Sequence, residues 1–301
     1  MSASTQLPAQ FVPVNQESNP IPKRPILRYH GGKWILAKWI IGHFPPHRIY
    51  VEPFGGAASV LLQKSRSYAE IYNDLDGELV NLFTVARERG EDLRTALELT
   101  PFARTEFAQS YTPAGDPVEQ ARRTVVRSFM GFGSNSHNKA TGFRSNSHRS
   151  GTTPAQDWRN YPSSFGAIMD RLRGVCIENR SAIEVMQPHD SARTLFYVDP
   201  PYVSETRDKG SDYRHEMTNE DHRALADYLH SVAGSVCLSG YPCALYDELY
   251  GDWRRVERKA LADGARKRTE VLWMNFTSEN ADLFATTPAE SSAVMDERGS
   301  R

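Results

Sequence analysis

The 301-residue chain lacks several features that define whole classes of protein. It has three cysteines and no Cys-x-x-Cys pair, which argues against a disulfide framework or a zinc site and suggests a reducing compartment. No apolar run approaches the ~18 residues of a membrane span. The N-terminus shows no basic-then-apolar signal pattern, so we expect a protein that is not secreted.

A strong overall charge is also missing, because the formal net charge is −1. Any surface for nucleic acid must therefore be a local patch. Residues 121–180 carry ten Lys or Arg against three Asp or Glu, a net charge of +7 in an otherwise acidic chain. Such a segment is typical of a phosphate-binding surface, although a solvated basic loop without a partner is the alternative. A second basic cluster lies at 266–268.

The most informative stretch is Asp199-Pro200-Pro201-Tyr202, which follows the apolar run 195–198. The run predicts a buried strand, and the two prolines end it because they cannot donate to a strand ladder. An acid at the strand end and an aromatic ring just beyond it can hold a flat ring that carries an amino group. An ordinary Asp-Pro-Pro turn is the alternative interpretation.

Glycine-rich turns precede this stretch. A strand predicted at 49–52 enters Pro53-Phe54-Gly55-Gly56, which we expect to open a helix containing Val60 and Leu62. A G-x-G-x-x-G fingerprint is absent, which disfavours a nicotinamide dehydrogenase. Asp74 ends the next predicted strand, 19 positions after Gly55, a spacing that suits an acid holding ribose hydroxyls. Gly31 and Gly32 precede Lys33 at the start of another predicted helix, an amphipathic one with apolar side chains on one face: Trp34, Ala37, Ile41 and Phe44.

The remaining pattern alternates strands and helices and predicts an open, mostly parallel α/β sheet whose last strands form an antiparallel hairpin. Helices are expected at 76–89, 91–99, 102–110, from Asp116 to Gly131, from Pro162 onward, and after Thr218, which Asp221 follows three positions on as in a capping box. Residues 131–160 lack periodicity and contain a near-repeat (Gly-Phe-x-Ser-Asn-Ser-His), which suggests a functional loop. His137 and His148 within it are weak metal candidates without a third ligand, so no metal is expected.

These stretches together resemble the Dam-like DNA adenine (N6) methyltransferases. The matching residues are Tyr29-His30-Gly31-Gly32-Lys33, then Val51 to Gly56, then Asn73-Asp74, then Asp199 to Tyr202, in the family's order. Two departures are Tyr29, where the family often has Trp, and Ala58, where glycine is common. The middle third of the chain matches only loosely, so the target sequence cannot be carried over.

The resemblance implies a Rossmann-like class I methyltransferase sheet with helices on both faces and an inserted, mainly helical target-recognition domain. The implied domains are a catalytic domain at 25–99 and 175–286 and a recognition insert at 100–174. Composition without an apolar face predicts disordered tails at 1–24 and 287–301. It also implies that S-adenosylmethionine binds at a set of strand-end residues: Tyr29, His30, Lys33, Glu52, Pro53, Phe54, Gly55, Gly56, Ser59, Asp74 and Asp199.

The activity implied is methyl transfer to N6 of an adenine flipped out of double-stranded DNA. Asp199, Pro200, Pro201 and Tyr202 would be catalytic. The residues expected to contact DNA are basic or amide side chains: Arg122, Arg123, Asn135, Lys139, Arg144, Arg149 and Lys267. A cognate restriction enzyme is a possible partner, and a cytoplasmic, bacterial or phage-encoded protein is implied. A methyltransferase acting on RNA or on a protein amide, and a catalytically silent DNA-binding relic, are the alternatives.

Overall fold

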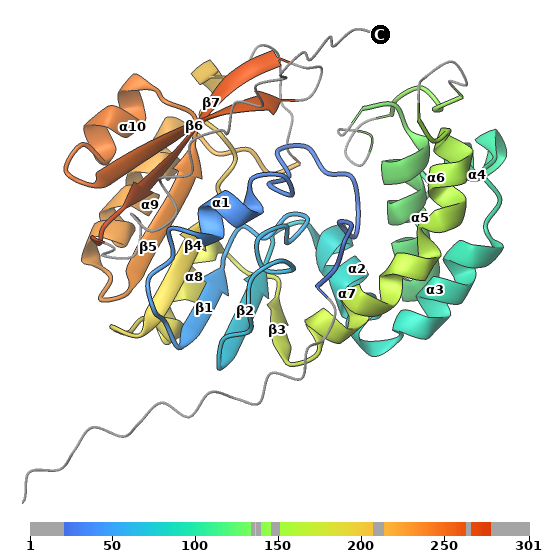
Figure 1. The fold of residues 1–301 in the computed structure, drawn as a ribbon, viewed down its shortest axis with the longest axis horizontal. Coiled ribbons are helices and arrows are strands. Elements are labelled where there is room, and N and C mark those ends of the chain that lie inside the picture. Colours follow the sequence, from blue (N-terminus) through green and yellow to red (C-terminus); the bar gives the residue numbers. More distant parts are fainter. Residues whose placement is uncertain are drawn as a thin grey trace, which may run out of the picture.

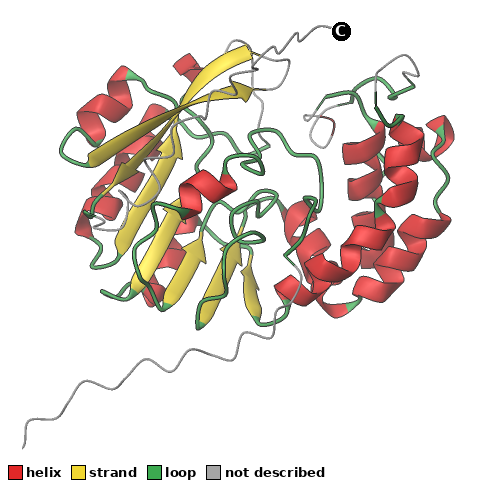
Figure 2. Cartoon of the chain, viewed as in Figure 1, coloured by secondary structure: helices red, strands yellow, loops and turns green. Residues whose placement is uncertain are grey.

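A computed structural model describes residues 21–133, 136, 140–145, 151–206, 214–262 and 266–277. Within these residues the chain builds a seven-stranded sheet in the order β3-β2-β1-β4-β5-β7-β6, with helices on both faces (Figures 1 and 2). The strands are β1 (Ile49–Glu52), β2 (Ala69–Asn73), β3 (Val175–Glu178), β4 (Thr194–Val198), β5 (Ser235–Gly240), β6 (Arg254–Ala262) and β7 (Arg266–Met274). The α/β class predicted from the sequence is confirmed.

Strands β1 to β5 run parallel, and β7 is antiparallel to both β5 and β6. The predicted C-terminal hairpin is therefore confirmed. Strand order reverses between β1 and β4, because β2 and β3 extend the sheet on one side of β1 and β4 and β5 extend it on the other. In open sheets of this kind, ligands bind outside the carboxyl ends of the strands at such a reversal.

Alternate residues of the central strands enter two separate cores, one on each face of the sheet. Tyr50 and Tyr197 belong to the first core, whereas Val51 and Phe196 belong to the second. The second core is covered by α8 (Ala182–Met186), α9 (Asn219–Ser231) and α10 (Ala244–Leu249). The first core is covered by α1 (Ala37–Ile41) and continues into the helices that separate β2 from β3.

Those helices form a body beside the sheet, on the right in Figure 1. We call α2 to α7 the helical body: α2 (Gly77–Glu88), α3 (Gly90–Leu99), α4 (Arg104–Gln109), α5 (Pro117–Met130), α6 (Pro154–Asn160) and α7 (Phe165–Leu172). Helix α5 packs against α2, α3, α4 and α6 and is the centre of this body. The predicted insert 100–174 contains α4 to α7, and its boundary at residue 100 stays a prediction.

Helix α5 starts where its sequence predicts. Asp116 accepts a hydrogen bond from the Glu119 backbone N–H, and Pro117 occupies the first turn, where its missing N–H costs nothing. The capping box predicted at Thr218 is present at the start of α9. Both helices bury an apolar face, as the 3.6-residue spacing indicates.

Three expectations about local structure are wrong. The glycine turn after β1 opens no regular helix, because Gly56 (φ 49°) and Ala58 (φ 52°) adopt left-handed backbone and 56–64 forms consecutive turns. The loop expected over 131–160 contains α6, which a Thr153–Gln156 capping box starts. Helix α1 is limited to five residues, shorter than the predicted amphipathic helix.

The two predicted tails fall mostly outside the described residues. Arg24, at the inner end of the first, donates to the Asp157 carboxylate of α6 at 2.5 Å. No helix in the described part of the chain is long and apolar enough to cross a membrane.

Candidate active site

Four segments that are distant in sequence meet at the carboxyl ends of β1, β2 and β4. Together with Ala182 and residues 214–217, they line one pocket, which we call the strand-end pocket. All eleven residues predicted to bind a cofactor line it: Tyr29, His30, Lys33, Glu52, Pro53, Phe54, Gly55, Gly56, Ser59, Asp74 and Asp199. The structure therefore brings together every member of that set, while the ligand itself stays a proposal.

Two backbone N–H groups of the glycine turn donate hydrogen bonds to residues at the end of β2. The Gly56 N–H donates to Asp74 Oδ2 at 2.8 Å, and the Gly55 N–H donates to the Asn73 carbonyl at 2.7 Å. A Cβ at Gly55 would lie 2.1 Å from the Tyr72 ring, so only glycine fits there. The Asp74 Oδ1 atom accepts a further bond from the Asp76 N–H at 2.8 Å. These bonds fix the Asp74 carboxylate at the pocket wall.

Glu52 ends β1 and is buried. Its Oε2 atom accepts hydrogen bonds from the Tyr50 hydroxyl at 2.8 Å and from the Leu61 N–H at 3.0 Å. Burial raises the pKa of Glu52 to about 8, and the nearby Asp199 carboxylate adds to the rise. Near neutral pH this side chain is therefore largely protonated, so it lines the pocket without a full negative charge.

The Asp199 carboxylate is held on both of its oxygens. Oδ1 accepts a hydrogen bond from Ser239 Oγ at 2.7 Å, and Oδ2 lies 3.0 Å from the Lys33 ammonium. Ser239 Oγ also lies 3.1 Å from the Tyr197 hydroxyl. The sequence analysis missed Ser239, whose only signal is its place near the end of β5, the parallel neighbour of β4.

Tyr202 lies next to Lys33 of the strand-end pocket but does not itself line the pocket. Among the described residues, Asp199 and Pro201 of the predicted catalytic turn line that pocket, whereas Pro200 and Tyr202 do not. The Tyr202 side chain is buried, its ring packs edge-on against Tyr241 with centroids 4.4 Å apart, and the Lys33 ammonium lies 4.7 Å from its centroid. The turn thus separates the acid and the phenol into two adjoining environments.

The second environment contains a buried acid that the sequence analysis missed. The Tyr202 hydroxyl donates to Glu270 Oε1 of β7 at 2.5 Å, and that oxygen lies 3.7 Å from the Lys33 ammonium. Burial raises the pKa of Glu270, and Asp199 raises it further while Lys33 opposes the shift. Lys33 therefore lies between two carboxylates, one from β4 and one from β7.

The sequence analysis also missed one wall of the pocket, which residues 214–217 form. Arg214 donates to Asp76 Oδ1 at 2.9 Å and lies 3.4 Å from Glu78 Oε1. Arg127 of α5 binds the other oxygen of Glu78. Because Glu78 contacts both arginines, it connects this wall with the helical body.

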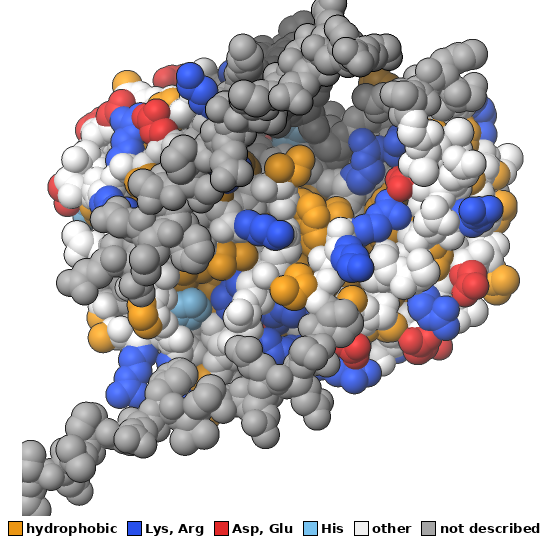
Figure 3. All heavy atoms as spheres, in the orientation of Figure 1, with side chains coloured by type: hydrophobic (Ala, Val, Ile, Leu, Met, Phe, Trp, Pro, Cys, Tyr) orange, Lys and Arg blue, Asp and Glu red, His pale blue; other side chains and the backbone are white. Residues whose placement is uncertain are grey.

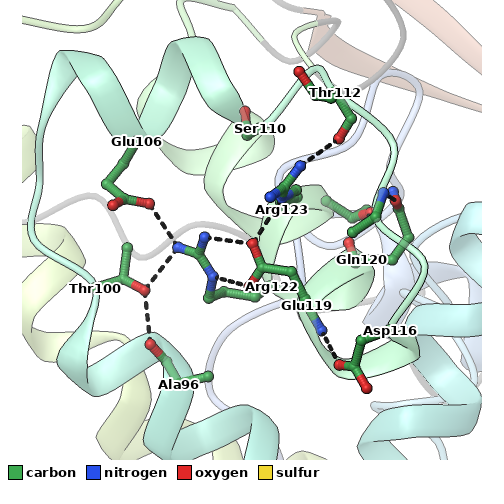
Figure 4. A network of polar contacts seen from close by, with 12 residues as sticks. Ala96, Thr100, Glu106, Ser110, Thr112, Asp116, Glu119, Gln120, Arg122 and Arg123 are labelled. Atoms are coloured by element: carbon green, nitrogen blue, oxygen red, sulfur yellow. Dashed lines mark hydrogen bonds and ion pairs between the residues drawn. The ribbon is translucent and has the colours of Figure 1, made fainter.

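Three of the residues predicted to contact DNA, Arg122, Arg123 and Arg144, bind helices of the helical body. Arg122 and Arg123 both bind the carboxylate of Glu119, and Arg122 also binds Glu106 at 2.8 Å (Figure 4). Hydrogen bonds from the two arginines lower the pKa of Glu119 to about 2. Arg144 donates to the Phe129 carbonyl at 2.9 Å. These contacts stabilise the helical body, and contact with DNA stays a prediction.

Several predicted residues lie outside what the structure describes: Asn135, Lys139, Arg149 and the histidines at 137 and 148. Lys267 lies in β7, but its side chain is not described. Among the described side chains, no group of three or more His, Cys, Asp or Glu is arranged to hold a metal ion.

Comparison with known proteins agrees with this arrangement. The family model described as D12 class N6 adenine-specific DNA methyltransferase matches residues 29–263. The chain is also similar to a DNA adenine methylase of Serratia marcescens, with 34% identity over 88 residues, or 29% of this chain. That stretch spans 30% of the relative's length. Because the family model covers well over half of the sequence and includes all four motif segments, the chain belongs to the D12 class N6 adenine-specific DNA methyltransferase family.

Proposed function

We propose that this protein transfers a methyl group from S-adenosylmethionine to the N6 amino group of an adenine extruded from duplex DNA. The observation that carries the proposal is the position of Asp199: its carboxylate lines the strand-end pocket and is also held by Lys33, which lies over the Tyr202 ring. One carboxylate thus lies between the strand-end pocket and the Tyr202 ring. That placement is what direct transfer between two ligands requires.

The residues of the strand-end pocket fit S-adenosylmethionine. Tyr29 and Phe54 supply aromatic surface for the adenine ring. Asp74 is held at the pocket wall by two backbone N–H bonds, and an acid at this place in the fold is suited to hold ribose hydroxyls. Arg214 places positive charge along the pocket for the methionine carboxylate. When bound, the cofactor supplies an electrophilic methyl group on a positively charged sulfur.

The target adenine would be held by the residues of the Asp199 turn. The Asp199 carboxylate and the Pro200 carbonyl accept the two amino hydrogens, and Tyr202 stacks on the ring. Accepting these hydrogens stabilises the positive charge that develops on nitrogen as the new bond forms, and the proton that N6 then loses passes to the Asp199 carboxylate. Since Lys33 now occupies Asp199 Oδ2, the incoming amino group takes the position that this ammonium holds.

A DNA partner is supported by the distribution of charge. Lys and Arg side chains gather along the middle of the face in Figure 3, between the sheet and the helical body, with few acidic side chains among them. Segment 121–180 has a net charge of +7. Extrusion of the base costs a few kcal/mol, which contacts to the backbone phosphates can offset. A cognate restriction enzyme and a cytoplasmic location stay predictions.

Methyl transfer from labelled S-adenosylmethionine to duplex DNA tests the proposal. The wild-type chain should label adenine N6, and Asp199→Ala should lose on the order of 100-fold or more in rate. The matched control is Asp252→Ala, an exposed acid in the turn before β6, which should retain full activity. Label that enters RNA or protein but not DNA would contradict the proposed substrate. Full activity of Asp199→Ala would contradict the mechanism.

A further inference from the structure

The contacts of Glu270 assign it a role that its place in the sequence does not suggest. It lies on β7, which pairs with β5 through Gly240 and Val271. This register brings Glu270 beside the end of β5 and next to the turn that follows β4. We propose that Glu270 is a positioning residue for methyl transfer, acting through Tyr202 and Lys33. The inference rests on the proposed function.

Glu270 fixes the phenol ring directly. Its Oε1 atom accepts the Tyr202 hydroxyl at 2.5 Å in a buried setting, with 3% of Glu270 and 4% of Tyr202 exposed. Little water competes for this hydrogen bond in its buried setting. The ring therefore has one fixed orientation when a base arrives, and a stacking surface that is already oriented needs no ordering during the reaction.

The same carboxylate acts on Lys33. The ammonium lies 3.0 Å from Asp199 Oδ2 and 3.7 Å from Glu270 Oε1, and both the lysine and Glu270 are almost fully buried. In the free enzyme, Lys33 thus occupies the donor position that the adenine amino group would take at Asp199. Once that group displaces it, Glu270 offers the ammonium a second carboxylate within the same cluster. A buried ammonium without such an acceptor would be costly.

Glu270 is distinct from the residues that bind the cofactor. It does not line the strand-end pocket, whereas Lys33 and Asp199 do. A positioning role therefore predicts a lower kcat with little change in cofactor affinity. A loss of general stability alone would change neither constant once they are measured per folded molecule.

The test compares Glu270→Ala, Glu270→Gln, Tyr202→Phe and the double variant Glu270→Ala/Tyr202→Phe. Methyl transfer to duplex DNA gives kcat, and calorimetry gives the cofactor Kd and the concentration of competent sites. We expect Glu270→Ala to lower kcat on the order of ten-fold, the usual effect of one strong hydrogen bond, with the cofactor Kd within about two-fold of wild type. Glu270→Gln keeps an acceptor for Tyr202 but loses the charge that faces Lys33, so its kcat should be intermediate.

The double variant shows whether Glu270 acts through Tyr202. If it does, the combined loss in kcat stays close to the larger single loss instead of reaching the product of the two. The matched controls are Glu70→Gln, an equally buried acid at the opposite end of β2, and Tyr161→Phe, a buried tyrosine whose hydroxyl donates to the Ile26 carbonyl. Both controls should keep wild-type kcat per competent site.

Each outcome is decisive. An active wild type with Glu270→Ala and Glu270→Gln at full kcat overturns this inference and leaves the proposed function intact. Multiplicative losses in the double variant overturn the route through Tyr202. A wild-type chain that methylates no adenine in DNA rejects the proposed function, and this inference with it.

Discussion

Replacing Glu70 by Gln should destabilise the protein more than the loss of a surface ion pair would. Glu70 lies in β2 with 4% of its surface exposed. Its carboxylate accepts two bonds from Arg171 of α7, at 2.6 and 2.9 Å, and one from Lys64 at 2.6 Å. The change leaves two buried cations facing a neutral amide. It therefore tests what holds α7 of the helical body to the sheet.

The size of the loss in stability depends on how Lys64 and Arg171 respond when the Glu70 charge is removed. Breaking a buried pair costs about 3–5 kcal/mol, because the remaining charge is uncompensated. Burial lowers the pKa of Lys64 to about 8, so without Glu70 the amine can lose its proton at modest cost. The Arg171 guanidinium loses the charged acceptor of both of its bonds to β2. We therefore expect a loss of about 3 kcal/mol, the low end of that range.

Urea unfolding followed by circular dichroism at pH 7 measures this loss. The control is Glu248→Gln, which breaks the exposed pair with Arg223 and should leave the unfolding midpoint almost unchanged. Burial opposes ionisation of Glu70, but Arg171 and Lys64 outweigh it and the pKa of Glu70 is lowered. A lowered pKa stabilises the fold above the unfolded value of about 4.3, and the benefit disappears as the pH falls through the folded pKa. The two variants should therefore differ most near neutrality; equal losses at pH 7 would refute the reasoning.

Three further predictions concern the strand-end pocket and the helical body. Gly55→Ala should lower the Tm by several degrees in a thermal scan, because its Cβ would meet the Tyr72 ring at 2.1 Å; an unchanged Tm would contradict the packing described. Asp74→Asn should weaken S-adenosylmethionine binding about ten-fold by calorimetry, because a carboxylate oxygen is lost; unchanged affinity would exclude Asp74 from the cofactor site. Ionised Glu119, whose pKa is about 2, should stabilise the fold fully above the unfolded value of about 4.3, and this contribution should be lost as the pH falls toward 2. Glu119→Gln should flatten this part of the curve of stability against pH. Identical curves for the two chains would contradict this prediction.

The sequence predicted the parts of the fold that depend on local patterns. The run before Asp199 became β4, and the capping residues at 116 and 218 start α5 and α9 where expected. The turn after Glu52 was mispredicted, because the sequence did not reveal that Ala58 adopts left-handed backbone. Helix α6 was missed because the polar composition around it masks its short apolar face.

Only some residues of the candidate site could be predicted from the sequence. Residues that directly follow strands, such as Asp74 and Asp199, could be predicted because parallel strand ends lie along one edge of a sheet. Ser239 and Glu270 could not, since their contacts with the Asp199 turn depend on how β4, β5 and β7 are paired. That pairing joins residues dozens of positions apart. Local periodicity carries no information about it.

The position of the helical body between two neighbouring strands also has a consequence for folding kinetics. Ile71 pairs with Cys176, so β2 and β3 can join only after a closed loop of about 100 residues has formed. Closing so long a loop is slow when the chain is unstructured, whereas helices form from nearby residues within microseconds. Early docking of α2 on α5 and α7 would shorten the effective loop. We therefore expect substitutions in that helical contact to slow refolding more than equally destabilising substitutions in the β6–β7 hairpin.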